Sequence, residues 1–392
     1  MDALAQEIRN RFIGLFKTEP LLIRSPGRIN LIGEHTDYND GFVMPAAIDK
    51  EIIFAIARSH SNESQIHALK YDQHITVDVN NPSKVNAPAW ANYLLGVLFQ
   101  IRQHGYTVGP FNCVFGGNIP TGSGLSSSAA LECGFGFALS ELFHLNIPRL
   151  KIVTIGQWAE HNYVGVKCGI MDQYASVMGK DGSVILLDCR SLNHRYAPID
   201  LHDHIIVLCD TKVKHALVDS EYNTRRSECE EGVRILKKHY PQIQSLRDAS
   251  VEMVNRHKPE LTGKIFDRCL YVVSEIERVQ AATKDLEAND LVAFGKKMYE
   301  THDGLSKLYE VSCAELDFLV DEAKRTGKVF GARMMGGGFG GCTINILKES
   351  DVDDVVGRLS AAYKAKYNID MPSYRVKIKD GTSILSTSTA SV

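Results

Sequence analysis

The residues with the clearest chemical meaning form a glycine–serine run at 119–130, with the sequence IPTGSGLSSSAA. The run follows a short apolar stretch that predicts a strand, and it opens a segment, 125–142, whose apolar periodicity predicts a helix. Gly122 and Gly124 can adopt backbone angles closed to other residues and let a ligand approach the main chain. Because free N–H groups and the dipole at a helix start attract anions, the run predicts a phosphate-binding loop.

Two common nucleotide motifs do not describe this loop. The chain contains no G-x-x-x-x-G-K-[ST] sequence, which excludes a Walker A loop, and the loop lacks the third glycine of the Rossmann fingerprint. A plain serine-rich helix cap is the alternative. Such a cap needs one serine, whereas Ser126, Ser127 and Ser128 follow two glycines, so we favour the phosphate loop.

A second glycine run lies at 336–341, with the sequence GGGFGG. It formally contains G-x-G-x-x-G, which raises a dinucleotide-dependent oxidoreductase as one hypothesis. Residues 342–347 alternate like a strand, however, whereas the Rossmann fingerprint must open a helix. Since five glycines in six residues cost much backbone entropy for a simple hairpin, we expect this loop to lie close to a bound ligand.

Charged and polar side chains crowd into residues 26–41, with the sequence PGRINLIGEHTDYNDG. Each carboxylate can accept two hydroxyl hydrogen bonds, and a neutral imidazole both donates and accepts. The loop can therefore read several sugar hydroxyls at once. Taken alone, it could also be a solvated turn or a metal site.

Apolar patterns elsewhere predict the elements that hold these loops. Helices are expected at 4–16, 90–103 and 150–163, with more between 221 and 325, and strands at 21–24, 42–48, 52–57, 75–79, 111–115, 184–187, 205–209, 329–333 and 342–347. This is an α+β pattern. The length of 392 residues favours two domains, 1–198 and 199–392, with the boundary near Pro198. The Ser/Thr-rich end, 382–392, is expected to be disordered.

The composition favours a small-molecule partner. With 44 basic and 47 acidic residues and a net charge of −3, the chain shows no footprint for nucleic acid or an anionic membrane. Nine cysteines without a C-x-x-C pair indicate neither a disulfide framework nor a cysteine zinc site. With no signal peptide and no apolar run of bilayer length, we expect a cytoplasmic monomer.

Taken together, residues 26–41, 120–129 and 336–341 closely resemble the three motifs of galactokinases in the GHMP kinase superfamily. Residues 90–93 (WANY), 168–173 and 220–226 are also similar to that family, so the resemblance covers nearly the whole chain. It implies two α+β domains with the active site in the cleft between them. It also implies ATP- and Mg²⁺-dependent phosphorylation of galactose at the anomeric hydroxyl, giving galactose 1-phosphate and ADP.

The resemblance further implies roles for individual residues. Asp172 would accept the proton of the attacking hydroxyl, with Arg28 as its cationic partner, although a structural ion pair is the plain alternative. The sugar would be held by Glu34, His35, Thr36, Asp37, Gly169 and Tyr222. The ATP phosphates would meet Gly122, Ser123, Gly124, Leu125, Ser126, Ser127 and Ser128. Trp90 would lie near adenine, and Mg²⁺ would be bound by Ser128 and Glu160; the plain alternatives are a packed Trp90 and an exposed helical Glu160.

The sequence departs from the family pattern at two places. Met335 stands where galactokinases usually have Thr, and residues 121–123 (TGS) replace a commoner Gly-Ala pairing. Two hypotheses compete with a galactokinase. One is a related kinase that acts on N-acetylgalactosamine or arabinose, and the other is a non-catalytic galactose sensor. The intact residues 34–37 favour galactose, and the complete run 126–130 together with Asp172 favours catalysis.

Overall fold

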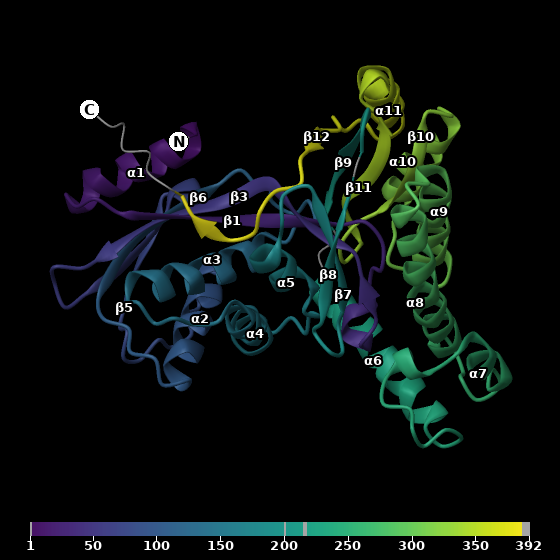
Figure 1. Cartoon of the computed structure of the whole chain (residues 1–392), viewed down its shortest axis with the longest axis horizontal. Helices are drawn as coiled ribbons and strands as arrows, with labels where there is room; N and C mark the ends of the chain where they lie inside the picture. Colours follow the sequence, from purple (N-terminus) through teal and green to yellow (C-terminus); the bar gives the residue numbers. More distant parts are fainter. Residues whose placement is uncertain (1, 200, 215–217, 386–392) are drawn as a thin grey trace.

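Three β-sheets and the helices packed on them form the structure, a computed structural model that describes residues 2–199, 201–214 and 218–385 (Figure 1). The largest sheet has the strand order β13-β1-β3-β6-β4-β5. Its strands are β1 (Leu21–Asn30), β3 (Pro45–Arg58), β4 (Ser64–Ala68), β5 (Gln73–Val77), β6 (Phe111–Gly117) and β13 (Ser383–Ile384). Neighbours are antiparallel except for β4 and β6.

Both faces of this sheet are covered by helices, because successive residues of a strand point to opposite sides. Leu22 and Ile53 pack with α1 (Ala3–Phe16) on one face, whereas their neighbours Ile23 and Phe54 belong to the main core on the other. In Figure 1, α1 lies on one side of the sheet and the remaining N-terminal helices on the other. These helices are α2 (Trp90–Gln103), α3 (Ser127–Leu142), α4 (Arg149–Ala159) and α5 (Met171–Met178).

The second half of the chain builds its own sheet, in the order β10-β11-β9-β12. A small third sheet, β2-β7-β8, adjoins the first. The strands are β2 (Phe42–Val43), β7 (Ser183–Asp188), β8 (His194–Pro198), β9 (His204–Lys214), β10 (Val329–Met334), β11 (Gly340–Lys348) and β12 (Ser373–Val376). The helices, on the right of Figure 1, are α6 (Val218–Leu236), α7 (Val251–Arg256), α8 (Ile265–Glu287), α9 (Leu291–Lys307), α10 (Ala314–Arg325) and α11 (Val352–Tyr367).

The predicted α+β class and most predicted elements are confirmed, with differences that have physical causes. The two strands expected at 42–48 and 52–57 are instead a two-residue β2 and one long β3. Polar residues 49–51 suggested a break, but Glu51 pairs with Arg24 across the sheet at 2.5 Å, so the strand continues. The helix expected at 150–163 ends as α-helix at Ala159 and continues as a π-helical turn, η3 (Glu160–Val164).

The prediction of a disordered end is wrong for residues 382–385. Thr382 is fully buried, donates to the Ser176 carbonyl at 2.9 Å, and leads into β13, which pairs with β1. In Figure 1 this yellow segment returns to the purple N-terminal strands. Residues 386–392 lie outside the described residues. Within the described ranges, no helix combines the length and apolar character needed to cross a membrane.

Candidate active site

The glycine–serine run forms a tight loop that ends where α3 begins. Gly122 and Gly124 have φ of 75° and 74°, in the left-handed region that favours glycine. Ser126 is also left-handed, at φ 57°, and its side chain makes no capping hydrogen bond with the helix. The loop is therefore not the serine cap that was its alternative. The first amides of α3 have no side-chain cap and can meet an anion.

Two residues expected to contact phosphates have side chains that face the protein. Ser123 and Leu125 are both 1% exposed. The Ser123 hydroxyl donates to the Pro120 carbonyl at 2.7 Å, and the Leu125 carbonyl accepts from the Arg28 backbone N–H at 3.1 Å. These residues shape the loop, so a ligand could meet them only through the main chain.

An apolar cavity of about 260 Å³ opens beside this loop. Its walls include Trp90 and Phe115, whose rings meet edge to face at 5.3 Å, and Ser127 and Ser128 border it. The Trp90 indole N–H donates to the Gln73 side chain at 2.9 Å, so Trp90 is both packed and part of the cavity wall. An aromatic slot next to a phosphate loop suits a planar base.

A second cavity, which we call the polar cavity, gathers residues from distant parts of the chain. It lies where the end of β1, the loop before α5, helix α6 and the β10–β11 hairpin meet. All the residues predicted to bind or activate the sugar line it, except Thr36. The full lining is Arg28, Glu34, His35, Asp37, Cys168, Gly169, Met171, Asp172, Tyr222, Gly336 and Gly337.

Arg28 and Asp172 form a two-point ion pair in the polar cavity. Arg28 Nε lies 2.8 Å from Asp172 Oδ1 and Nη2 lies 3.0 Å from Oδ2, while the Ser126 hydroxyl donates to Oδ2 at 2.5 Å. Burial opposes the charge of Arg28, but Asp172 and Glu34 raise its pKa above the usual value. The Arg28 side chain is 4% exposed and that of Asp172 26%, so the carboxylate remains reachable by a ligand.

Glu34 is held by a buried arginine that the sequence analysis missed. Arg333 is fully buried; its Nη1 lies 3.1 Å from Glu34 Oε1 and its Nε donates to the Leu31 carbonyl at 2.9 Å. The Gly336 N–H donates to the same Glu34 oxygen at 2.8 Å. The one signal in the sequence was the position of Arg333, a charged residue at the end of the otherwise apolar predicted strand 329–333. Glu34 is thus fixed by the C-terminal sheet.

Asp37 lies directly against Gly169. A Cβ on Gly169 would come within 1.8 Å of Asp37 Oδ2, so any larger residue there would displace the Asp37 carboxylate. Burial, followed by the charges of Asp172 and Glu34, raises the pKa of Asp37 to about 7. The carboxyl is therefore able to switch between accepting and donating near neutral pH.

His35 forms an aromatic wall of the polar cavity. Its ring lies 5.3 Å from the Tyr222 ring and 5.0 Å from the Tyr309 ring, and Nδ1 lies 2.8 Å from the Tyr38 hydroxyl. Burial and the charge of Arg225 lower the pKa of His35 to about 3. The imidazole is therefore neutral; its buried Nε2 makes no hydrogen bond of normal geometry in the described structure, and the Gly337 backbone is the polar group that acts on the ring from the second glycine run.

Thr36 differs from its neighbours, and its predicted contact with the sugar is not supported. It is fully buried, and its hydroxyl lies 2.9 Å from the Gly33 carbonyl and 2.7 Å from the Phe42 carbonyl. With its only donor directed to the backbone, Thr36 holds the loop closed instead of facing the polar cavity.

The second glycine run joins β10 to β11 and packs on the phosphate loop. A Cβ on Gly336 would lie 3.1 Å from the Gly124 carbonyl oxygen, and one on Gly338 would lie 2.1 Å from that of Val311. The run leads into a strand, as predicted, so a Rossmann site is wrong. Gly336 and Gly337 also line the polar cavity.

Glu160 and Ser128, the predicted metal ligands, lie together. Glu160 begins the π-helical turn, is 8% exposed, and lies close enough to the Ser128 and Cys168 side chains for both to lower its pKa. The alternative of an exposed helical acid is therefore wrong. Burial and the nearby charge of Asp172 raise the pKa of Glu160 to about 7. A buried carboxylate beside a hydroxyl is a donor set that fits Mg²⁺.

A second buried acid, Glu132, supports this group and was missed from sequence. The Gln173 side-chain amide donates to Glu160 Oε2 at 2.8 Å and to Glu132 Oε2 at 3.1 Å. Glu132 is fully buried, and burial together with Glu160 raises its pKa well above the usual value. The sequence signal that could have identified Glu132 is its position as the single acid within the apolar stretch 129–139.

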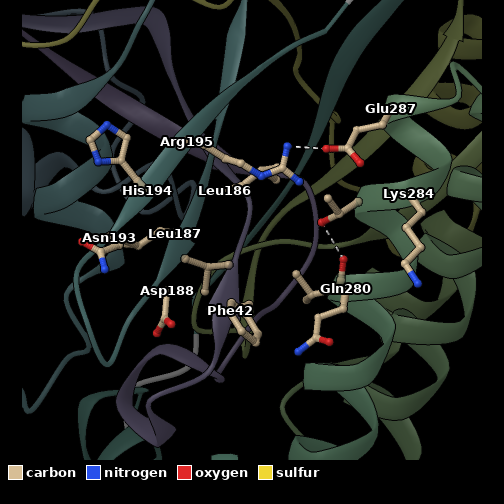
Figure 2. Close-up of a pocket in the computed structure, with 13 residues that line it drawn as sticks. Phe42, Leu186, Leu187, Asp188, Asn193, His194, Arg195, Gln280, Lys284 and Glu287 are labelled. Atoms are coloured by element: carbon tan, nitrogen blue, oxygen red, sulfur yellow. Dashed lines mark hydrogen bonds and ion pairs between the residues drawn. The ribbon is translucent and has the colours of Figure 1, made fainter.

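A larger cavity, about 460 Å³, lies between the small sheet and α8 (Figure 2). Phe42 forms part of its apolar floor. Both of its carboxylates are paired: Asp188 accepts from Arg247 at 2.9 Å, and Glu287 pairs with Arg195, which Figure 2 shows reaching across the opening. The His194 Nδ1 is likewise engaged, 2.7 Å from the Tyr174 hydroxyl, and neither glycine run borders this cavity, so the polar cavity is the better candidate for phosphoryl transfer.

Comparison with family models matches three parts of the chain. Residues 10–58 match the galactokinase galactose-binding signature, residues 92–180 the GHMP kinases N terminal domain, and residues 282–365 the GHMP kinases C terminal. These segments contain the polar loop, the phosphate loop and the second glycine run.

Known proteins resemble the chain along nearly its full length. A galactokinase of Thermotoga maritima is 39% identical over 92% of this chain and 98% of its own, and one of Clostridium beijerinckii is 40% identical over 96% and 97%. The crystal structure of Lactococcus lactis galactokinase complexed with galactose superposes with TM-score 0.93, at 34% identity over 97% of this chain and 99% of its own. Methanococcus jannaschii mevalonate kinase, at 18% identity over 93% of this chain and 100% of its own, shares the fold with TM-score 0.65. Identity sustained across both halves, with the same arrangement of strands and loops, shows that the chain belongs to the galactokinase family of the GHMP kinases, enzymes that phosphorylate a small molecule with ATP.

Proposed function

We propose that this enzyme transfers the γ-phosphoryl group of ATP to the anomeric hydroxyl of D-galactose, giving galactose 1-phosphate and ADP. The observation that carries the proposal is the Arg28–Asp172 pair. It faces the polar cavity and is bound, through Ser126, to the phosphate loop. A hydroxyl held in that cavity would therefore lie between a carboxylate and the phosphate-binding loop.

In the proposed mechanism, Asp172 orients the attacking hydroxyl and accepts its proton. Phosphoryl transfer passes through a loose transition state, so positioning and charge neutralisation contribute more than strong nucleophile activation. Arg28 supports both, since it is ion-paired with Asp172 and donates to the Gly124 carbonyl of the phosphate loop. The Asp172 carboxylate remains partly exposed to the cavity, which supports a role beyond that of a structural ion pair.

The sugar would be read by Glu34, His35 and Asp37, with Gly169 and Tyr222 completing the wall. Glu34 is a fixed acceptor because Arg333 and the Gly336 N–H hold it. His35 is neutral and lines the cavity, so its ring can exchange a hydrogen bond with a sugar hydroxyl. Two acids and an imidazole at fixed positions suit a polyhydroxylated ligand.

ATP is expected to place its base in the apolar cavity at Trp90 and its phosphates on the start of α3, near Gly122, Gly124, Ser127 and Ser128. Ser128 and Glu160 would hold Mg²⁺; this is supported by their hard oxygen donors and by the raised pKa of Glu160, which any cation beside it would lower. When bound, Mg²⁺ neutralises the charge that develops on the phosphates.

The proposal is tested by measuring ADP release from ATP and Mg²⁺ with galactose, glucose, N-acetylgalactosamine and arabinose offered in parallel, and by identifying the product. Selective turnover of galactose to the 1-phosphate is expected. Preference for another sugar would assign a related kinase. Galactose binding without turnover would assign a sensor.

The domain boundary near Pro198 and the monomeric, cytoplasmic state also remain proposals. The boundary is supported by β8 ending at Pro198 and by β9, which starts at His204, opening the C-terminal sheet. Light scattering of the full chain measures the mass that a monomer predicts.

A further inference from the structure

Three side chains of metal-ligating type meet at the corner between α6 and α7, the lower right of Figure 1. His239 Nε2 lies 2.8 Å from Glu260 Oε2, and His257 Nδ1 lies 3.0 Å from Glu260 Oε1. The three ligand atoms, one from each residue, all lie within 4.8 Å of one another. None of these residues lines the polar cavity or the apolar cavity beside the phosphate loop.

The backbone around this cluster is held by regular turns. His239 follows the end of α6 and donates its backbone N–H to the Leu236 carbonyl at 3.0 Å. His257 ends α7, and the Glu260 N–H donates to the His257 carbonyl at 2.9 Å, which brings Glu260 back over that histidine. Leu236 and Leu261 are buried in the core beneath. The three side chains are therefore presented on a fixed support.

The two imidazole rings lie face to face beside Glu260, and one of them must turn about its side-chain torsions before both can bind one ion, because a metal lies in the plane of each ring that ligates it. They stack with centroids 4.0 Å apart and an interplanar angle of 22°. The remaining nitrogen of His257, Nε2, lies 3.3 Å from the Tyr240 hydroxyl. When Nε2 donates to Tyr240, Nδ1 presents its lone pair toward Glu260. This is the outer hydrogen bond that commonly orients a metal-binding histidine.

The charges at the corner favour a cation. The Glu260 carboxylate lies within 2.8 Å of one ring nitrogen and 3.0 Å of the other, and a bound cation would take the place of the ring protons that can bridge these atoms. Two of the neighbouring lysines have other partners: Lys237 donates to Gln244 at 3.2 Å, and the Lys258 ammonium lies over the Phe266 ring. Two ring nitrogens and one carboxylate therefore converge around a position that a cation can occupy.

We propose that His239, His257 and Glu260 bind one divalent transition-metal ion of the zinc class. Two imidazoles and one carboxylate form a common three-ligand set for tetrahedral Zn²⁺, with water in the fourth position. The imidazoles select against Mg²⁺, which prefers oxygen ligands. The ion joins the end of α6 to the end of α7 and is separate from the Mg²⁺ expected at Glu160.

The test uses the metal-stripped full-length protein without nucleotide. Calorimetric titration with Zn²⁺ should give one site per chain, and Co²⁺ should give the intense visible absorption of tetrahedral coordination. His239→Asn and, independently, Glu260→Gln should each weaken binding by about tenfold or more, while galactose phosphorylation stays at the wild-type rate. Both positions are partly exposed, so neither change disturbs the core.

The matched control is His67→Asn. His67 and His74 also stack, with centroids 4.9 Å apart, but His67 is bonded to Gln65 and not to a carboxylate. The control should bind Zn²⁺ like the wild type. Absence of a stoichiometric site, unchanged affinity in both corner variants, or a Co²⁺ spectrum with thiolate charge-transfer bands would overturn the proposal.

Discussion

Three acids near the proposed site fall into two groups that differ in their counter-charge: Asp172 alone, and the pair Glu160 and Glu132. Asp172 is paired at two points with Arg28 and also accepts from Ser126. Glu160 and Glu132 share one amide, that of Gln173, and among the described residues neither has an ion pair with a lysine or arginine. The first group carries its counter-charge within the protein, whereas the second needs protons or a bound cation.

This difference assigns different tasks to the two groups. A carboxylate paired with an arginine can orient and deprotonate a hydroxyl without a counter-charge from a ligand. Buried carboxyls with raised pKa values are ready for a metal ion, because a divalent charge replaces the protons they would otherwise hold. Changes in the first group should therefore affect turnover, and changes in the second should affect metal dependence and stability.

The largest effect is expected for Asp172→Asn. Loss of the base should lower kcat by about 10²–10⁴-fold, with ATP binding nearly unchanged because Asp172 does not line the apolar cavity. Rates come from ADP release, and ATP affinity comes from calorimetry. Asp188→Asn is the matched control, since Asp188 is also paired with an arginine and is similarly exposed, at 25% against 26%. Activity of the Asp172 variant close to that of the control would remove Asp172 from catalysis.

Gly169→Ala should be the next largest change. The new methyl group would come within 1.8 Å of Asp37 Oδ2 and must displace a carboxylate of the sugar wall. We expect KM for galactose to rise about 10–100-fold with a smaller change in kcat, since the Arg28–Asp172 pair is untouched. Gly14→Ala, in a helix with open space around it, should leave both constants unchanged. A normal KM in the Gly169 variant would contradict the assigned sugar wall.

Glu160→Gln probes the second group directly. Removal of the charged ligand should raise the Mg²⁺ concentration for half-maximal rate by about tenfold or more, and excess Mg²⁺ should recover part of the rate. The exposed Glu7→Gln on α1 serves as control. An unchanged Mg²⁺ titration would show that the metal binds elsewhere.

The two groups also differ in how far sequence could predict them. Arg28 and Asp172 are 144 positions apart, but each lies in a motif whose resemblance to a known family places it. Glu132 belongs to none of the motifs, and Gln173 lies in the segment 168–173 but was given no role of its own. Their link to Glu160 depends on a π-helical turn that apolar periodicity does not predict.

The fold shows the same limit. Long amphipathic helices such as α2 were predicted to the residue, since a 3.6-residue period is explicit in the sequence. Helix α5, which carries Asp172, has eight residues and was missed. Strand β13 was mistaken for a disordered end because its stability comes from pairing with β1 and from the buried Thr382, and neither contact is local.

The smallest expected effect is a pH dependence of stability that Glu132→Gln should remove. The pKa of Glu132 in the folded protein is raised, so between its usual value near 4.5 and the raised value the folded state holds a proton that the unfolded state has lost. Stability from this group is therefore lost as pH rises. Asp37 and Glu160 act in the same direction up to about pH 7, and His35 acts in the opposite direction below its usual pKa of 6.5.

Comparing the variant with the wild type isolates Glu132 from those other groups. The introduced amide has no proton to lose, so the metal-free variant should gain stability relative to the wild type as pH rises from 5 to 8. Urea unfolding at several pH values measures the difference, and Mg²⁺ with ATP should reduce it by neutralising the same buried charge. If the difference between the two proteins does not vary with pH, Glu132 is ionised in the folded state, and the contrast between the two carboxylate groups no longer holds.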